Sequence, residues 1–590
     1  MKGKDMTGLP QYILSLFTQA EAERREIEDR WLQDLRQYKG VYDPEVESRL
    51  HPRRSRAYIR LTRAKVRSID ARLSDLLFPG SGEKNWALAP TPTPELAFAS
   101  ASAVAQSAPT GADEHQVRGA ILETARQACE RMSREIEDQL DEAGYADIIR
   151  DVIHSGNLYG TGVLKGPLVA ASATVGWSQH NGRWHLEPRK RLRPYVEFVP
   201  LWDLYPDMSA SCMTNCRYVF QRHRFTKADL SDMAGREDFF GESITEHLRA
   251  YPHGDADDKN HETLLRDLSD ASRIGVSDRD SGRYEMLEFW GYASGELLEP
   301  YFLEAEFNPE CDYRINAYVL GQNVVKLVVD PLSGHDWPFY FYYYEKDETG
   351  IFGEGAARIM RDPQLLFNAS IRAMLDNAAI CAGPQIEVNQ DLLPENEDPT
   401  DIHPFRVWLR SGAGLDSQYP AVRVSTMPSY TQEFLTMAEM FSTYIHETTA
   451  VPKLNPDDFS SPASQTMRGL SMLMGAAGVT LKDQVRLFDE GITKPFLTAL
   501  YHWNMALNPR ADIKGDFSVK PLGWTSLVAK EIFVEQLDAF AKFTTNELDA
   551  PYIHRGELLR RMAASRNLGH GIVKSEEEMQ GEREASGTKE

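Results

Sequence analysis

Few residues in this sequence have both the type and the spacing that chemistry requires. The glycines between Gly156 and Gly166 lack the Gly-Lys-Ser/Thr ending of a phosphate-binding loop, and their spacing does not fit a dinucleotide site. We therefore expect a turn between a helix and a strand there. Cys212 and Cys216 have the wrong spacing for a zinc knuckle, and no second pair accompanies them. A metal site is not indicated.

Other candidate groups lack recognisable partners. His154 and His223 are isolated, and the acidic residues Asp457 and Asp458 lie in a run typical of a solvated face, as do the acids at 304–306. No GxSxG or HExxH motif occurs. The sequence therefore predicts no cofactor, no metal and no enzymatic activity.

The composition sets the class of protein. The chain has 590 residues, of which 42% are hydrophobic and 26% charged, enough for a sizeable core in about four structural units. No stretch approaches the roughly 20 apolar residues of a transmembrane helix, and the first residues do not resemble a signal peptide. Five cysteines give no disulfide framework. We expect a protein made in a reducing cytosol, without a membrane segment.

The formal net charge is −23, from 88 acidic and 65 basic residues. Because DNA affinity rests on neutralising phosphates, this balance argues against a tight DNA-binding surface. One basic cluster, in the predicted helical region 51–80, is an exception to this acidic balance. This cluster could contact nucleic acid, but we favour an interface that pairs with the surplus carboxylates, on this or another copy. Its members are Arg53, Arg54, Arg56, Arg60, Arg63, Lys65, Arg67 and Arg72.

The hydrophobic pattern changes its period along the chain. An amphipathic helix is predicted over 8–36. From 175 to 345, aromatic β-rich runs and an Asn181-Gly182 hairpin signal predict strands, whereas 226–283 is polar and weakly helical. Residues 89–113 are rich in Pro, Ala, Ser and Thr and predict a flexible surface insert.

The following part of the chain predicts two helices of about 20 residues, joined by a short β-type segment. Asp362 is the expected N-cap of the first helix, Pro363 its first position, and Gly383-Pro384 its end. Each helix is apolar over a stripe that its partner covers only in part, so packing between copies in a closed ring would cover the rest. The stripes comprise Leu366, Ile371, Met374, Leu375 and Ile380 in the first helix, and Phe434, Leu435, Met437, Met440, Phe441 and Ile445 in the second.

Five stretches carry a resemblance to a known family, in that family's order, from residue 55 to about 496. They are RSRAYIRLTRAKVRSIDARLSDLLFP, TGVLKGP, FVPLWDLYPD with YVFQRHRFTKADL, GIFGEGAARIMRDPQLLFNASIRAMLDNAAICAGPQIEVN, and VPKLNPDDFSSPASQTMRGLSMLMGAAGVTLKDQVRLFDEGITKPF. The chain resembles the portal, or head-to-tail connector, proteins of short-tailed double-stranded DNA bacteriophages. The insert at 89–113 is not placed by the family pattern.

The resemblance implies an α+β, mainly helical subunit that forms a ring of about 12 copies around an axial channel. The implied parts are a wing (1–352), a first stem helix (353–382), a clip (383–428), a second stem helix (429–448), a tunnel loop (449–466), a kinked channel or wing helix (467–505), and a crown with a polar C-terminal tail (506–590).

The resemblance also implies a function. The ring would be made in the bacterial host cytoplasm, occupy one capsid vertex of the virion, nucleate the procapsid, and pass double-stranded DNA without sequence specificity during packaging and ejection. Its partners would be terminase, the major capsid and scaffolding proteins and later tail adaptor proteins, with no membrane. Two alternatives remain open: another virion ring or adaptor protein, and a packaging enzyme such as a nuclease. The missing GxxxxGK[ST] motif argues against a packaging motor.

Finally, the resemblance implies which residues face DNA and partners. An acidic and small-polar lining repels phosphate and lets a duplex slide. The expected channel residues are Lys453, Asp457, Asp458, Ser460, Ser461, Ser464 and Arg468. Trp and Arg often dominate interfaces, so the expected docking residues of the clip are Arg406, Trp408, Arg410 and Arg423.

Overall fold

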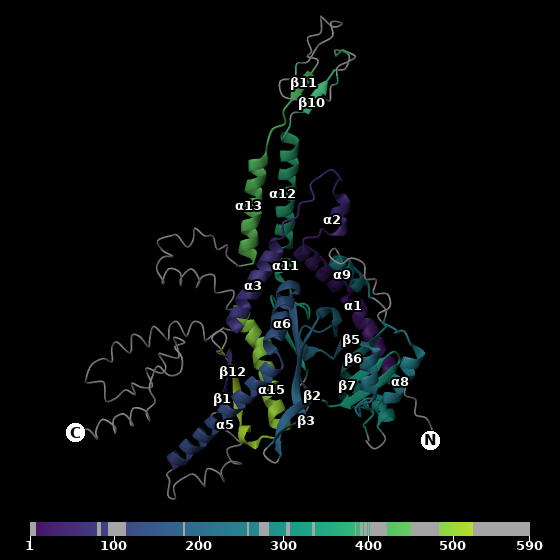
Figure 1. Cartoon of the computed structure of the whole chain (residues 1–590), viewed down its shortest axis with the longest axis vertical. Coiled ribbons are helices and arrows are strands. Elements are labelled where there is room, and N and C mark those ends of the chain that lie inside the picture. Colours follow the sequence, from purple (N-terminus) through teal and green to yellow (C-terminus); the bar gives the residue numbers. More distant parts are fainter. Residues whose placement is uncertain are drawn as a thin grey trace, which may run out of the picture. The chain divides into compact units, whose positions relative to one another are not determined.

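The computed structural model contains two compact units, which Figure 1 traces in sequence colours. Unit 1 comprises Met1–Leu32, Val66–Ala356 and Pro456–Glu590, and unit 2 comprises Gln33–Lys65 and Ala357–Asn455. The structure describes residues 8–522 except 79–83, 92–113, 181–182, 257–258, 271–281, 303–306, 333–336, 384, most of 390–421, and 450–482. Helices and sheets occur together, which confirms the predicted α+β class.

Most secondary structure belongs to unit 1. Its helices are α1 (Gly8–Lys39, whose end lies in unit 2), α3 (Leu61–Leu77, whose start lies in unit 2), α5 (Glu114–Glu142), α6 (Tyr145–Tyr159), α7 (Lys227–Ala234), α8 (Gly241–Ala250), α9 (Asn260–Asp270), α10 (Gly295–Leu298) and α15 (Lys494–Leu507). Its strands are β1 (Trp86–Pro90), β2 (Thr161–His180), β3 (Arg183–Val199), β4 (Leu204–Pro206), β5 (Tyr218–Thr226), β6 (Arg283–Ser294), β7 (Asp312–Leu320), β8 (Asn323–Val329), β9 (Phe339–Tyr343) and β12 (Phe517–Pro521).

The largest sheet is antiparallel, with strand order β4-β5-β6-β7-β8. The N-terminal part of α1 covers one face, where Phe17 packs with Phe220 and Phe289. Helices α7 and α8 cover the other face, where Leu230 and Ile244 join a second cluster. Since β6 is central and covered on both faces, its residues are buried almost continuously instead of alternately.

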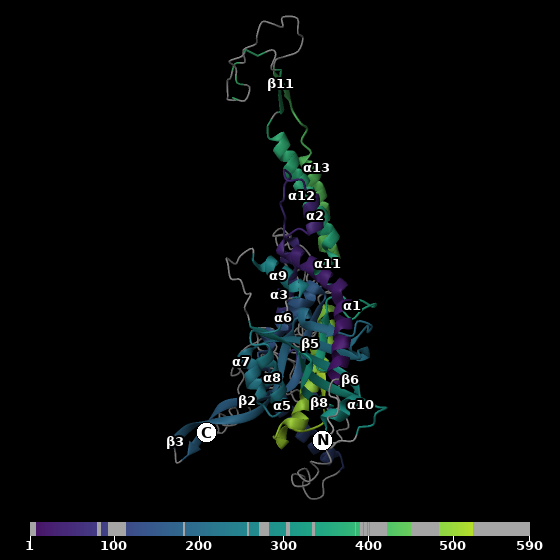
Figure 2. The ribbon, with the colours of Figure 1, turned by 90° about the vertical axis from the view of Figure 1, so that its right-hand side faces the viewer.

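A second sheet has the order β3-β2-β9, and the strands β1 and β12 form a separate antiparallel pair. Strand β9 pairs only with Thr161–Lys165 of β2. Beyond an irregularity between Lys165 and Leu168, β2 and β3 continue as a two-stranded ribbon out to the pair His180–Arg183. Figure 2 shows this ribbon projecting from the rest of unit 1. The strands on either side of Asn181-Gly182 agree with the predicted hairpin.

A buried ion pair joins the two larger sheets. The Lys165 ammonium on β2 lies 2.6 Å from a Glu288 carboxylate oxygen on β6 and 2.7 Å from the Gln221 side-chain oxygen on β5. His223 and Trp290 contact the same carboxylate. Every strong charge in this cluster thus has a partner, as burial requires.

The glycines after α6 form the predicted turn between a helix and a strand. Gly160 is the C-cap of α6, with a φ of 97°, and β2 begins at the next residue. A Cβ atom at Gly160 would lie 2.1 Å from the Gly353 carbonyl oxygen, and one at Gly162 2.0 Å from that of Val152. Close backbone packing, and no phosphate cradle, therefore explains these glycines.

Unit 2 contains a helix hairpin formed by α12 (Arg361–Cys381) and α13 (Thr431–Thr448), with the short strands β10 (Gln385–Val388) and β11 (Val422–Ser425). The remaining helices are α2 (Pro44–Arg49) and α11 (Ala356–Ile359), which begins at the unit boundary. Both long helices were predicted, but the capping prediction was wrong. Helix α12 already begins at Arg361, so Asp362 lies in its first turn and Met360 is the N-cap.

Candidate functional site

The helix hairpin is fastened to an extended segment of unit 2 by buried polar side chains of α12. The Gln364 amide donates to the Ile59 carbonyl at 2.9 Å, and the Ile59 N–H donates to the Asn368 side chain at 3.0 Å. Further along the helix, Asp376 accepts a hydrogen bond from the Ser55 N–H. These bonds satisfy backbone groups of a segment that has no regular structure of its own, so they fix which face of α12 is covered.

Two arginines of α12 strengthen this attachment. Arg361 forms a 2.6 Å ion pair with Asp43, and the Arg372 guanidinium donates to the Tyr42 hydroxyl while lying 4.8 Å from the centre of its ring. Both contacts link α12 to residues that immediately follow α1. The side of α12 that faces residues 42–62 is therefore charged and hydrogen-bonded, which distinguishes it from the rest of the helix surface.

The two helices of the hairpin are joined near its tip, and the far end of α13 is held by Lys65 of α3. The Tyr430 N–H donates to the Asn377 side chain at 2.9 Å, so the start of α13 is held against the end of α12. Near the other end of α13, the Lys65 ammonium lies 2.5 Å from His446 Nδ1. Ala438 and Ile445 are buried along the inner face of α13. The hairpin thus has a buried inner face, which distinguishes it from the outer surface.

Its outer surface is unusually apolar. We define the α12 seam as Leu366, Ala373 and Ile380, spaced by one heptad, and the α13 seam as Met437, Met440 and Tyr444, spaced as i, i+3, i+7. The five large side chains of these seams are 43–49% exposed, and Leu375 and Leu435 are exposed nearby. Apolar side chains gathered in this way mark a surface that another protein covers.

The sequence stripes anticipated part of this surface. Leu366, Leu375, Ile380, Leu435, Met437 and Met440 belong to the predicted stripes and are exposed, whereas Ile445 is buried. Tyr444 was missed, although its position seven residues after Met437 was a signal that could have identified it. The polar residues Gln364 and Asn368 were also missed, since nothing local shows that they bind a segment 300 residues earlier.

The predicted docking and channel residues lie mostly outside the described part of the chain. Arg423 is exposed on β11, directly opposite Glu387 on β10. The other docking residues, Arg406, Trp408 and Arg410, fall outside the described residues. So do all seven channel residues, which are Lys453, Asp457, Asp458, Ser460, Ser461, Ser464 and Arg468.

The basic cluster has few internal partners. Arg56 pairs with Glu47 at 3.3 Å, and Arg63 lies over the Tyr38 ring. Arg53, Arg54 and Arg67 are exposed, and within the described ranges no carboxylate lies within ion-pair distance of them. Lys65 is buried and contacts His446, so Arg53, Arg54 and Arg67 are the members open to an acidic partner or to phosphate, and both interpretations stay open.

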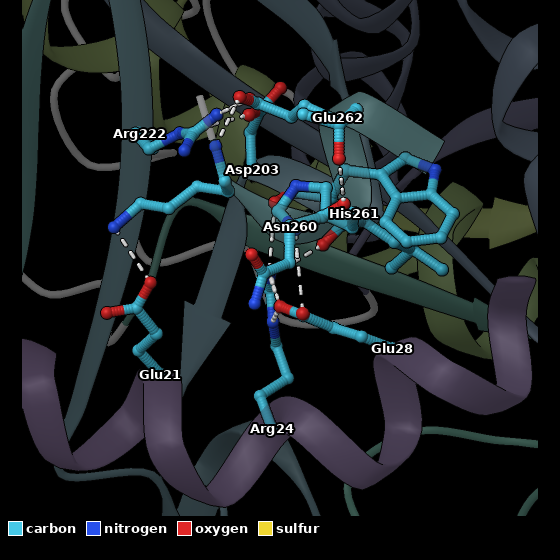
Figure 3. A network of polar contacts seen from close by, with 12 residues as sticks. Glu21, Arg24, Glu28, Asp203, Arg222, Asn260, His261 and Glu262 are labelled. Atoms are coloured by element: carbon cyan, nitrogen blue, oxygen red, sulfur yellow. Dashed lines mark hydrogen bonds and ion pairs between the residues drawn. The ribbon is translucent and has the colours of Figure 1, made fainter. Parts of the chain in front are cut away.

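A dense network of charged side chains lies within unit 1 (Figure 3). The Arg24 guanidinium is fully buried, pairs with Glu28, and donates to the Leu201, Trp202 and Leu204 carbonyls around the short 3-10 turn Leu201–Asp203. This arrangement holds α1 against the turn that leads into β4.

Helix α9 joins this network through charges. His261 Nδ1 lies 3.5 Å from Glu28, and the His261 ring stacks on Trp202 at 5.3 Å. Glu262 pairs with Arg222 and Arg224 of β5, and Lys259, just before α9, pairs with Glu21 at 2.7 Å. Burial alone would raise the pKa of Glu28, but the bonds from His261 and Arg24 outweigh it and lower that pKa to about 2. The network fastens α9 to α1 and β5.

The other groups considered for chemistry also have structural partners. His154 Nδ1 lies 2.8 Å from Asp70, and the hydrogen bond that the imidazole donates to this carboxylate raises the pKa of His154. Cys216 is buried, and burial raises the pKa of its thiol to about 12. Groups of three or more possible metal ligands do not occur among the residues that the structure describes. Over the same residues, no helix has the length and hydropathy to cross a bilayer.

Comparison with known protein families gives a match that covers the helix hairpin and the two larger sheets. A family model described as the Phage SU10 portal protein matches residues 99–521, well over half of the chain. The chain belongs to this family of phage portal proteins. The match includes the helix hairpin and all strands from β2 to β12. A search of curated proteins found no match. Portal proteins are structural components of the virion at a capsid vertex, and this chain shares their phage portal function.

Proposed function

We propose that this chain forms a closed ring of about twelve copies that conducts double-stranded DNA through one capsid vertex. The observation that carries the proposal is the pair of exposed apolar seams on α12 and α13. Because the two seams lie on different helices, the α12 seam of one copy can cover the α13 seam of the next. Repetition of one such heterologous contact generates a ring.

The parts of the ring follow the order of the chain. Residues 353–382 and 429–448 form the stem, 383–428 the clip that binds terminase and later tail adaptors, and 449–466 the tunnel loop beside the DNA. Residues 1–352 form the wing, 467–505 the kinked helix, and 506–590 the crown and tail. In this arrangement the ring nucleates the procapsid, admits DNA during packaging and releases it during ejection. An acidic chain suits a conduit, because it does not hold phosphates tightly.

Electron microscopy of the purified full chain tests the proposal. Class averages viewed along a symmetry axis should show a ring of about twelve subunits with an opening of ~20 Å or more, the width of a B-DNA duplex with its grooves. A chain that stays monomeric at high concentration and after addition of a scaffolding protein would exclude it.

A second measurement separates the ring from an enzyme. The purified chain should show no ATP hydrolysis and no DNA cleavage in the presence of Mg²⁺. Turnover that co-purifies with the chain through successive columns, and that disappears with a point variant of this chain, would contradict the structural role.

A further inference from the structure

The ribbon formed by β2 and β3 beyond Leu168 has two chemically different faces. Cross-strand partners share a face, so the register Val169–Pro194, Ala171–Leu192, Ala173–Lys190, Val175–Pro188, Trp177–Leu186 and Gln179–Trp184 defines one of them. We call these twelve positions the apolar ribbon face, because only Gln179 and Lys190 are polar. The opposite face carries four arginines, at 183, 189, 191 and 193.

The apolar ribbon face is exposed at three of its positions in the single chain. Val169, Leu192 and Trp184, which sample it from base to tip, are 56%, 48% and 64% exposed. A strand that alternates in this way normally has its apolar side on a core. Moreover, a two-stranded ribbon in water is only marginally stable on its own. A third layer on the apolar face would therefore stabilise a ribbon of this length.

Charge indicates what that layer is. Residues 168–195 contain five basic side chains and one acidic side chain, whereas the whole chain has a net charge of −23. The ribbon is thus complementary to the acidic body of another copy of the same protein. A nucleic acid would engage the arginine face and leave the apolar face in water, so it explains only half of the pattern.

We infer that the apolar ribbon face of each copy packs on unit 1 of the neighbouring copy, as a second contact between subunits beside the helix seams. This inference rests on the proposed ring. It assigns to the ribbon the role of an arm, in which apolar burial supplies affinity and the arginines favour the acidic neighbour.

Site-specific photo-crosslinking in the assembled full chain tests the arm. The photoreactive residue p-benzoylphenylalanine replaces Trp184 on the apolar face or, as a matched control, Tyr195, an exposed aromatic residue on the opposite face. Irradiated rings should give a covalent dimer of two 66.8 kDa chains from position 184, with several-fold less from position 195. Mass spectrometry of the dimer should place the crosslink in unit 1 of the second chain.

The outcomes separate the two proposals. Rings that form but give no interchain product from position 184 overturn the arm and leave the portal ring intact. Absence of rings overturns both. A crosslink from position 184 to DNA, or to a scaffolding or capsid protein in procapsids, also overturns the arm, because the occupant is then not a second copy.

A pair of aspartate substitutions gives an independent readout. Leu192→Asp, on the apolar face, should reduce the yield of rings several-fold, whereas Ser172→Asp, on the opposite face of the same ribbon, should not. Circular dichroism identifies a variant that fails to fold. If either variant does so, the photo-crosslinking experiment alone tests the arm. Equal ring yields from two folded variants would count against the arm.

Discussion

Lys165 and Glu288 form a 2.6 Å ion pair between side chains that are 2% and 0% exposed, and this pair spans the contact between two sheets of unit 1. Burial alone would raise the pKa of Glu288, but the Lys165 ammonium and the hydrogen bond from His223 hold it far below its usual range. The carboxylate is therefore charged throughout the physiological range. Whether this buried charge is tolerated in the fold therefore depends on the Lys165 ammonium.

Removal of Lys165 tests this dependence. Lys165→Met leaves the Glu288 charge buried without its cation, and we expect a loss of about 3–5 kcal/mol in the free energy of unfolding. In the double variant Lys165→Met/Glu288→Gln the buried charge is gone, so the loss should be smaller than the sum of the single losses. Urea denaturation followed by circular dichroism measures both. Strict additivity would show that the two groups are not coupled.

The second prediction concerns acid and the α9 network. The pKa of Glu28 is about 2 in the folded chain against an ordinary value of 4.5, so the ionised group stabilises the fold at neutral pH. This contribution is complete above about pH 4.5 and is lost as the pH falls toward 2. We expect the free energy of unfolding of wild type to exceed that of Glu28→Gln by about 3 kcal/mol at pH 7 and by roughly 1 kcal/mol at pH 3. A pH-independent difference in unfolding free energy would contradict this.

The glycines at the two ends of α6 provide a matched pair. Gly144 has a φ of 66°, but the position that a Cβ atom would take there has nothing within 4 Å, whereas a Cβ at Gly160 would meet the Gly353 carbonyl oxygen at 2.1 Å. Gly144→Ala should cost roughly 1–2 kcal/mol, from backbone conformation alone. Gly160→Ala should cost clearly more, because the backbone must also move. Thermal unfolding compares them, and equal losses would refute the steric explanation.

The α13 seam yields a prediction about assembly. Met440→Asp places a charge where the proposed ring buries an apolar side chain. We expect at least a tenfold lower association constant for each subunit contact, equivalent to about 1.4 kcal/mol per contact, and therefore a still larger loss of assembled ring. Gln432→Asp is the control, since Gln432 is also exposed on α13 but lies outside the seam. Sedimentation velocity measures the ring fraction. If both variants assemble as wild type does, the seam is not the subunit contact.

Local sequence signals predicted several elements of this fold, although strand β2 begins at Thr161, before the region in which strands were expected, and β1 was not predicted. The period of apolar residues predicted α12, α13 and the aromatic strands, and the glycine spacing predicted the turn after α6. They were insufficient for contacts between distant segments. Gln364 and Asn368 are ordinary polar residues of a helix in the sequence, and only the folded chain places the Ile59 backbone beside them. The same holds for Arg24, which lies in a charged block typical of a solvated helix face but is completely buried.

The function was predictable for a different reason. A family resemblance depends on the order of several segments along the chain, and this order is visible without knowledge of any contact. The exposed side of a helix is not visible in that way. Phe441 and Met440 are adjacent and equally apolar in sequence, yet the first is half-buried and the second is in the exposed seam, because only the packing of α13 on α12 distinguishes them.

The position of α1 in the core of unit 1 has a consequence for biosynthesis. Leu9, Ile13 and Phe17 pack with Phe289 and Ala317, which are translated about 300 residues later. At roughly 5–20 residues per second, the ribosome needs about 15–60 s to supply those partners. During this interval the apolar stripe of α1 has no native surface to bind. Exposed apolar surface of this kind promotes aggregation, so the apolar stripe of α1 is a point of vulnerability while the chain is being made.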